Sequence, residues 1–231
     1  MVLLIFAWLV TKHHGKLYAP GDFETDQSFL KTLSPEAREE RLEEEIESLE
    51  PAFAGTSFQM PTISDANART DNSELKADDK SSESRAEIMT SYKTAEELAL
   101  KQYETEMDVS LQRHIIVPNI GADRLAFDGG YIKRSYLTLI EVKFFRKHFV
   151  PASIIRDVIY RAALVQSQLS KNDGLIVKLI LLVVTDLVGS DLEKLKKRLK
   201  NIANESLLPT EVRFFNFSRL RKKYPDISTC T

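Results

Sequence analysis

The chain has 231 residues, of which 43% are hydrophobic and 29% are charged, which is typical of a globular protein with one ordinary domain and additional segments. Its formal net charge of -2 excludes the basic excess of a protein that coats DNA regardless of sequence. The single cysteine, Cys230, excludes an intramolecular disulfide and a cysteine-rich zinc site. A reducing, cytoplasmic location is the simplest interpretation.

The N-terminus carries an unbroken apolar run, Met1 to Val10. Ten residues are too few for a membrane span, which needs about 20. No positive residue precedes the run and no small-residue cleavage site follows closely, so it is no convincing signal peptide. The end of a longer span, an interfacial anchor and a buried strand stay open. If the run contacts a membrane, Lys12 and Lys16 favour a cytoplasmic location for the residues that follow.

Three zones are expected along the chain, at residues 1–50, 51–85 and 86–231. In the first zone, Ser34 and Pro35 predict the start of an acidic helix. Its apolar residues form only a narrow stripe, which favours a solvent-exposed helix or one that docks lightly. The second zone is dominated by Ser, Thr, Asp, Asn and Lys, and predicts a disordered linker.

The third zone alternates between helical and strand patterns. Helices are predicted at about 87–108 and 152–170, and a basic helix follows Asp191. Strands are predicted at 114–117, 124–128, 136–145, 175–184 and 211–217, with a turn at Gly129-Gly130. This order predicts an α/β fold with a mixed central sheet flanked by helices.

The most unusual local feature is Glu141-Val142-Lys143 within the otherwise apolar strand at 136–145. Because side chains alternate along a strand, Glu141 and Lys143 share one face. Ionised groups in a buried strand need partners or a function. An ion pair on an edge strand is the simpler structural alternative.

Asp128 ends the preceding predicted strand, and a hairpin would bring it towards Glu141. Two carboxylates held close together repel each other unless a cation lies between them. Oxygen ligands of this kind suit Mg²⁺ or Mn²⁺. The alternative is that Asp128 is an ordinary turn residue before Gly129.

The pattern Asp128-(x12)-Glu141-Val142-Lys143 resembles the signature of the PD-(D/E)XK, or restriction-endonuclease-like, nuclease superfamily. The resemblance covers about residues 90–185 and implies an α-β-β-β-α-β core. It also implies that the acidic pair binds a divalent metal and that the lysine assists phosphodiester hydrolysis. Glu96 best matches the metal-site glutamate on the first helix of many members, with Glu97 second. Phe127 stands where the signature has proline.

The resemblance implies a nuclease that uses Mg²⁺ or Mn²⁺ and acts on nucleic acid, which we interpret as DNA. Asp128, Glu141 and Lys143 are the expected catalytic residues, and Asp128, Glu141 and Glu96 the expected metal ligands. A catalytically inactive module that binds nucleic acid or a protein partner is the main alternative, with the helix at 36–50 as a docking element. A membrane-associated adaptor is the third.

Basic residues near the C-terminus and on the second helix have two interpretations. They could contact phosphates, but an exposed, solvated surface is the commoner situation. His114 is interpreted as isolated. The residues in question are Arg156, Arg161, Lys194, Lys196, Lys197, Arg198, Lys200, Arg219, Arg221, Lys222 and Lys223.

Overall fold

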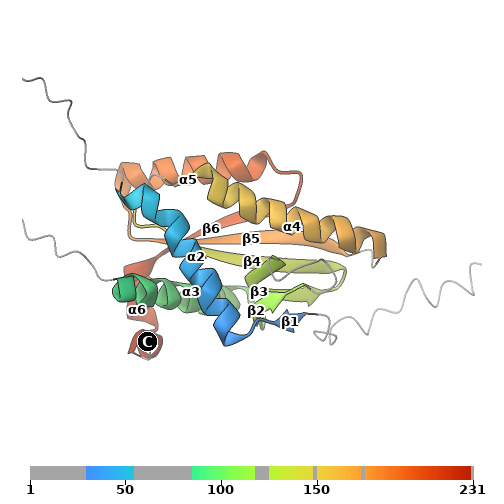
Figure 1. Ribbon diagram of the computed structural model, residues 1–231, viewed down its shortest axis with the longest axis horizontal. Coiled ribbons are helices and arrows are strands. Elements are labelled where there is room, and N and C mark those ends of the chain that lie inside the picture. The colour runs from blue at the N-terminus through green and yellow to red at the C-terminus, as the bar shows by residue number, and fades with distance from the viewer. Residues whose placement is uncertain (1–29, 55–84, 118–124, 148–149, 173–174, 230–231) are drawn as a thin grey trace, which may run out of the picture.

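The computed structural model describes residues 30–54, 85–117, 125–147, 150–172 and 175–229 (Figure 1). The apolar run at residues 1–10 and most of the predicted linker, residues 55–84, lie outside this part. No helix in the described ranges is long and apolar enough to cross a membrane.

A six-stranded mixed sheet forms the centre of the fold, with the strands in the order β1-β2-β3-β4-β5-β6. The first four strands pair antiparallel, and β4, β5 and β6 pair parallel. Their bounds are β1 Lys31–Thr32, β2 Gln112–Ile116, β3 Ala126–Lys133, β4 Tyr136–Phe144, β5 Ile176–Thr185 and β6 Thr210–Asn216. The expected α/β class with a mixed sheet flanked by helices is therefore confirmed.

Helices cover both faces of the sheet. They are α2 Pro35–Ala54, α3 Arg85–Met107, α4 Ala152–Asn172, α5 Gly189–Asn204, α6 Phe217–Lys223 and α7 Pro225–Thr229. In Figure 1, α4 and α5 lie on one side of the sheet and α3 and α6 on the other, while α2 crosses diagonally in front. The crossing places α2 next to the strands that carry the candidate site.

The strands β4 and β5 occupy the middle of the sheet. Residues 179–184 of β5 are at most 1% exposed, as expected for a strand covered on both faces. β4 lies between β3 and β5, so Glu141 and Lys143 stand on a central strand and not on an edge. An edge-strand ion pair is thereby excluded.

The turn predicted at Gly129-Gly130 was wrong. Both glycines lie within β3, and the hairpin instead turns at Arg134 and Ser135. Glycine serves here for close approach of chains. A Cβ on Gly130 would lie 2.5 Å from Ile115 Cδ1 and 2.9 Å from the backbone oxygen of Thr138.

Replacing Gly130 with alanine is expected to lower the free energy of unfolding by about 1–3 kcal/mol, because the added methyl group overlaps backbone that cannot move aside freely. Gly129→Ala is the matched control, since its Cβ would meet nothing closer than 3.4 Å. Urea denaturation of the two variants measures the difference. Equal losses would contradict the close-approach explanation.

Candidate active site

The candidate site lies where β3 and β4 separate. Their ladder runs from Lys133↔Tyr136 to Gly129↔Ile140. Phe127 packs with the core residues of α4, whereas a Cβ on Gly129 would face Leu100 of α3. Residues two apart in a regular strand share a face, so the strand is irregular at Asp128. The Asp128 carboxylate there accepts a hydrogen bond from the backbone N–H of Val142 at 2.7 Å.

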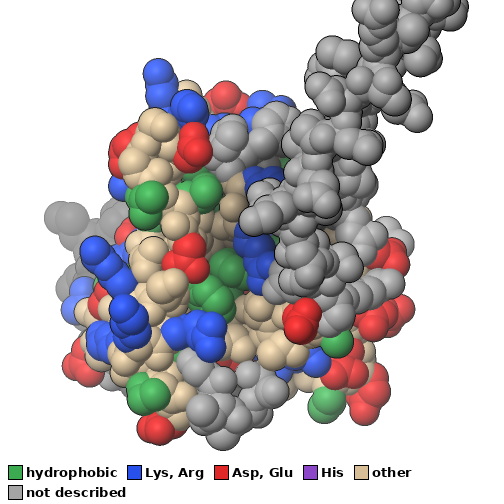
Figure 2. All heavy atoms as spheres, turned by 90° about the vertical axis from the view of Figure 1, so that its left-hand side faces the viewer, with side chains coloured by type: hydrophobic (Ala, Val, Ile, Leu, Met, Phe, Trp, Pro, Cys, Tyr) green, Lys and Arg blue, Asp and Glu red, His purple; other side chains and the backbone are tan. Residues whose placement is uncertain are grey.

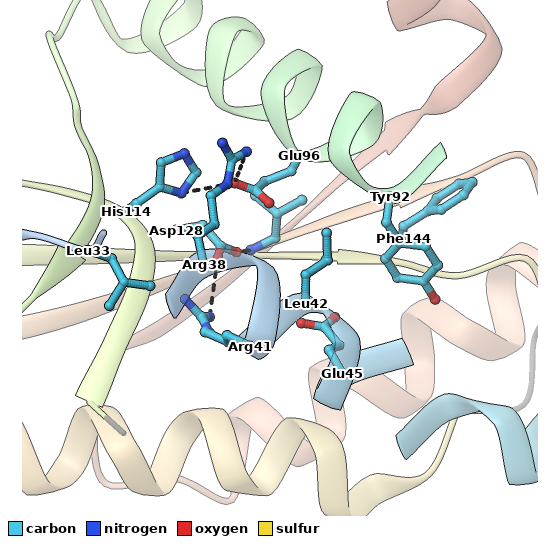
Figure 3. A pocket seen from close by; sticks show the side chains of 11 residues that line it. Leu33, Arg38, Arg41, Leu42, Glu45, Tyr92, Glu96, His114, Asp128 and Phe144 are labelled. Carbon is cyan, nitrogen blue, oxygen red and sulfur yellow. Dashed lines mark hydrogen bonds and ion pairs between the residues drawn. The ribbon is translucent and has the colours of Figure 1, made fainter. Parts of the chain in front are cut away.

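The carboxyl groups of Asp128 and Glu141 converge on one cationic atom. The Nη2 of Arg41, from α2, lies 3.2 Å from Asp128 Oδ1 and 2.7 Å from Glu141 Oε2. Figure 3 shows the Arg41 side chain pointing to Asp128. The two carboxyl groups are therefore close enough to share a cation, and in this structure that cation is a guanidinium.

Two further cations surround Glu141, whose side chain is fully buried. Lys143 Nζ lies 2.8 Å from Glu141 Oε1 and 2.6 Å from Glu45 Oε2 of α2. Arg161 Nη2 of α4 lies 3.0 Å from Glu141 Oε1, and its Nη1 donates to the backbone oxygen of Ala126. Arg161 is therefore part of the site and does not lie on a solvated helix face.

The surroundings of the two carboxyl groups shift their pKa values in opposite directions. Burial opposes ionisation of Glu141, but Arg41, Lys143 and Arg161 outweigh it and hold the pKa of Glu141 well below its usual range. Burial, followed by the neighbouring Glu141 charge, raises the pKa of Asp128, which Arg41 only partly offsets. Ionisation is therefore favoured at Glu141 and opposed at Asp128.

Glu96 lies in a neighbouring cluster and not directly with the acidic pair. Its Oε1 is 3.3 Å from Arg38 Nη2 and 3.2 Å from His114 Nδ1, and Figure 3 shows the three side chains together. Burial and then the Asp128 charge raise the pKa of Glu96. Among the described residues, Glu96, Glu97 and His114 have ligand atoms within 4.8 Å of one another. The interpretation of His114 as isolated was wrong.

The helix α2 contributes three charged residues that the sequence did not reveal as part of the site. These are Arg38, Arg41 and Glu45. Leu42 and Ile46 of the same helix are 8% and 2% exposed and join the core. The helix therefore docks more closely than its narrow apolar stripe predicted. Their spacing of three and four positions predicts that these residues share one face of the helix. It does not predict what that face contacts.

A groove of about 760 Å³ opens between α2 and α4 beside the site. Its lining includes Glu141, Lys143 and Arg161, together with acidic residues of α2 such as Glu40 and Glu44. A smaller cavity of about 30 Å³ lies between α2 and Asp128, large enough for about one water molecule. The site can therefore be approached from the α4 side.

The side chains present suit a divalent cation with hard oxygen ligands. Asp128 and Glu141 supply carboxylate oxygens of the kind that Mg²⁺ and Mn²⁺ bind, at a position where Arg41 Nη2 now contacts both. No protein-family model, curated protein or solved structure matches the chain.

Proposed function

We propose that the chain is a metal-dependent nuclease that hydrolyses phosphodiester bonds of DNA with Mg²⁺ or Mn²⁺. The observation that carries the proposal is the convergence of Asp128 and Glu141 on one cationic atom, with Lys143 Nζ 2.8 Å from Glu141. The order α3-β2-β3-β4-α4-β5 supports a restriction-endonuclease-like core, because it has the α-β-β-β-α-β sequence of that core.

In this proposal each residue has a separate role. Asp128 and Glu141 would hold the metal, and Glu96 lies near enough to Asp128 that burial and then the Asp128 charge raise the pKa of Glu96. When bound, a divalent ion would polarise the scissile phosphate and lower the pKa of a water molecule. Lys143 remains charged, because Glu141 and Glu45 outweigh its burial and raise its pKa. Its ammonium group can stabilise negative charge on a phosphate.

Basic residues also lie away from the site. Figure 2 shows one end of the molecule, where Lys and Arg side chains on the left half of the view are interspersed with Asp and Glu side chains. The last turn of α6 is wholly basic, with Arg221, Lys222 and Lys223. Some basic residues of α5 pair with acidic neighbours of their own helix, as Lys194 does with Asp191 and Lys196 with Glu193. The helix α6 contains no acidic residue, but it lies on the face of the sheet opposite α4 and the groove.

Cleavage of linear, circular and branched DNA with Mg²⁺ or Mn²⁺ tests the proposal. We expect cleavage by the wild type or by Arg41→Ala, in which the competing guanidinium is gone, and a loss of about a thousandfold or more when Asp128→Asn is added. Lys178→Met, which removes an ion pair with Glu211 away from the acidic pair, is the control. Cleavage by none of these proteins with either metal, or equal cleavage with and without Asp128→Asn, would contradict the proposal.

A second candidate function follows from the position of Arg41. If the guanidinium occupies the cation position permanently, the chain is a catalytically inactive module that binds nucleic acid or a protein partner. DNA binding that weakens with salt, without hydrolysis by wild type or Arg41→Ala, would favour this candidate over the nuclease.

A further inference from the structure

One face of α2 carries a charge opposite to each charged group that it meets in the candidate site. Arg38 meets Glu96 and Glu97 at 3.3 and 3.1 Å. One turn further, Arg41 meets the acidic pair, and Glu45 meets Lys143 at 2.6 Å. The three residues are spaced by three and four, so the helix presents them as a single row.

The position of Arg41 is incompatible with a metal bound by the same two carboxyl groups. Its Nη2 already lies within contact distance of both Asp128 and Glu141. A Mg²⁺ ion needs oxygen ligands at about 2.0–2.1 Å. It would have to occupy the same space as the guanidinium, and the two positive charges would repel each other. Either the guanidinium or the metal can occupy this position, but not both.

Two apolar side chains and several ion pairs, in the part of α2 whose side chains are described, hold the helix on the rest of the fold. Leu42 and Ile46 are its buried apolar residues within the described side chains, and they pack in the cluster that contains Tyr92 and Phe144. Outside the site, Glu39 pairs with Lys93 of α3 at 2.9 Å. Most of the acidic residues of α2 are exposed. Within the described side chains, undocking α2 therefore takes two apolar side chains out of that cluster and breaks the ion pairs of its charged row.

We propose that α2 is an autoinhibitory helix, in which Arg41 takes the place of the divalent cation and must leave before metal binds at Asp128 and Glu141. Metal and docked α2 then compete, and whatever holds α2 in place lowers the apparent affinity for metal. The consequence for DNA cleavage rests on the proposed nuclease function. The competition itself rests only on the acidic pair and Arg41.

The first test measures Mn²⁺ binding to the full chain by calorimetry and by the paramagnetic resonance of free Mn²⁺. Arg41→Ala is expected to bind Mn²⁺ at least about tenfold more tightly than the wild type, because the competitor is removed. Arg156→Ala should bind as the wild type does, since its exposed ion pair lies away from the site. Unchanged or weaker Mn²⁺ binding by a folded Arg41→Ala would overturn the proposal.

The second test holds α2 in place without altering the site. Glu39→Cys and Lys93→Cys, in a Cys230→Ser background, put two thiols where the ion pair now joins α2 to α3. A short bis-methanethiosulfonate cross-linker should lower Mn²⁺ affinity at least about tenfold, and a reductant should restore it. Equal Mn²⁺ affinity before and after cross-linking would overturn the proposal, even if Arg41→Ala does not fold.

The two proposals fail in different ways. If no variant cleaves DNA but Arg41→Ala binds Mn²⁺ more tightly, the nuclease proposal fails and the competition stands. If wild type and Arg41→Ala cleave DNA at the same rate and bind Mn²⁺ equally, the autoinhibitory role fails and the nuclease stands.

Discussion

The Glu141→Gln variant is expected to lose about 3–5 kcal/mol of unfolding free energy, because the substitution removes a fully buried anion that three cations share. Lys143 would keep Glu45 and Arg161 would keep Asp157 as a partner, but both would lose the buried anion that they share with Arg41. The side-chain volume hardly changes, so the loss reports on charge and not on packing.

Glu211→Gln is the matched control for this experiment. Glu211 also contacts two cations, Lys178 and Arg213, but its side chain is 35% exposed. Exposed ion pairs contribute about 0–1 kcal/mol, so the control should lose little. Urea denaturation of the two variants gives the comparison. Losses of the same size would show that the interior of the site does not depend on the Glu141 charge.

The Lys143→Met variant is expected to reduce DNA cleavage by about a hundredfold or more while binding Mn²⁺ at least as tightly as its parent protein. Removing the ammonium group takes away a charge that can stabilise the phosphate, and it also removes positive charge beside the metal position. The comparison is made in the Arg41→Ala background, so that the guanidinium does not compete with the metal. The Glu141 carboxylate keeps Arg161 as a partner.

Cleavage rates at saturating Mn²⁺ and the Mn²⁺ dissociation constant are the two readouts for Lys143→Met. Lys178→Met provides the control, since Lys178 lies on β5 and pairs with Glu211 away from the acidic pair. Weaker Mn²⁺ binding without any change in the saturated rate would assign Lys143 to the structure of the site instead of to the reaction.

The proximity of Asp128 and Glu141 could be predicted from the sequence because of the geometry of a hairpin. Five residues lie between Asp128 and the turn at Arg134 and Ser135, and five lie between the turn and Glu141, so the two acids come to the same level of the hairpin. The spacing of the two acids therefore predicts their proximity, although the turn was predicted wrongly at the two glycines. Glycine marks both turns and close approaches of strands, and periodicity alone does not separate the two.

The contribution of α2 could not be predicted, because it depends on contacts between residues far apart in the chain. Arg41 and Glu141 are 100 positions apart, and nothing in a local pattern links them. An acidic helix with a narrow apolar stripe is typical of an exposed surface element. Only the tertiary structure shows that the basic residues on one face of α2 meet the acids of the site.

A manganese-soaked crystal of Arg41→Ala, with diffraction data collected at the manganese absorption edge, tests the central claim most directly. We expect an anomalous peak in contact with both the Asp128 and Glu141 carboxylates. A peak only at the cluster of Glu96, Glu97 and His114, or no peak near the acidic pair at saturating Mn²⁺, would contradict the assignment of these two carboxylates as a metal site.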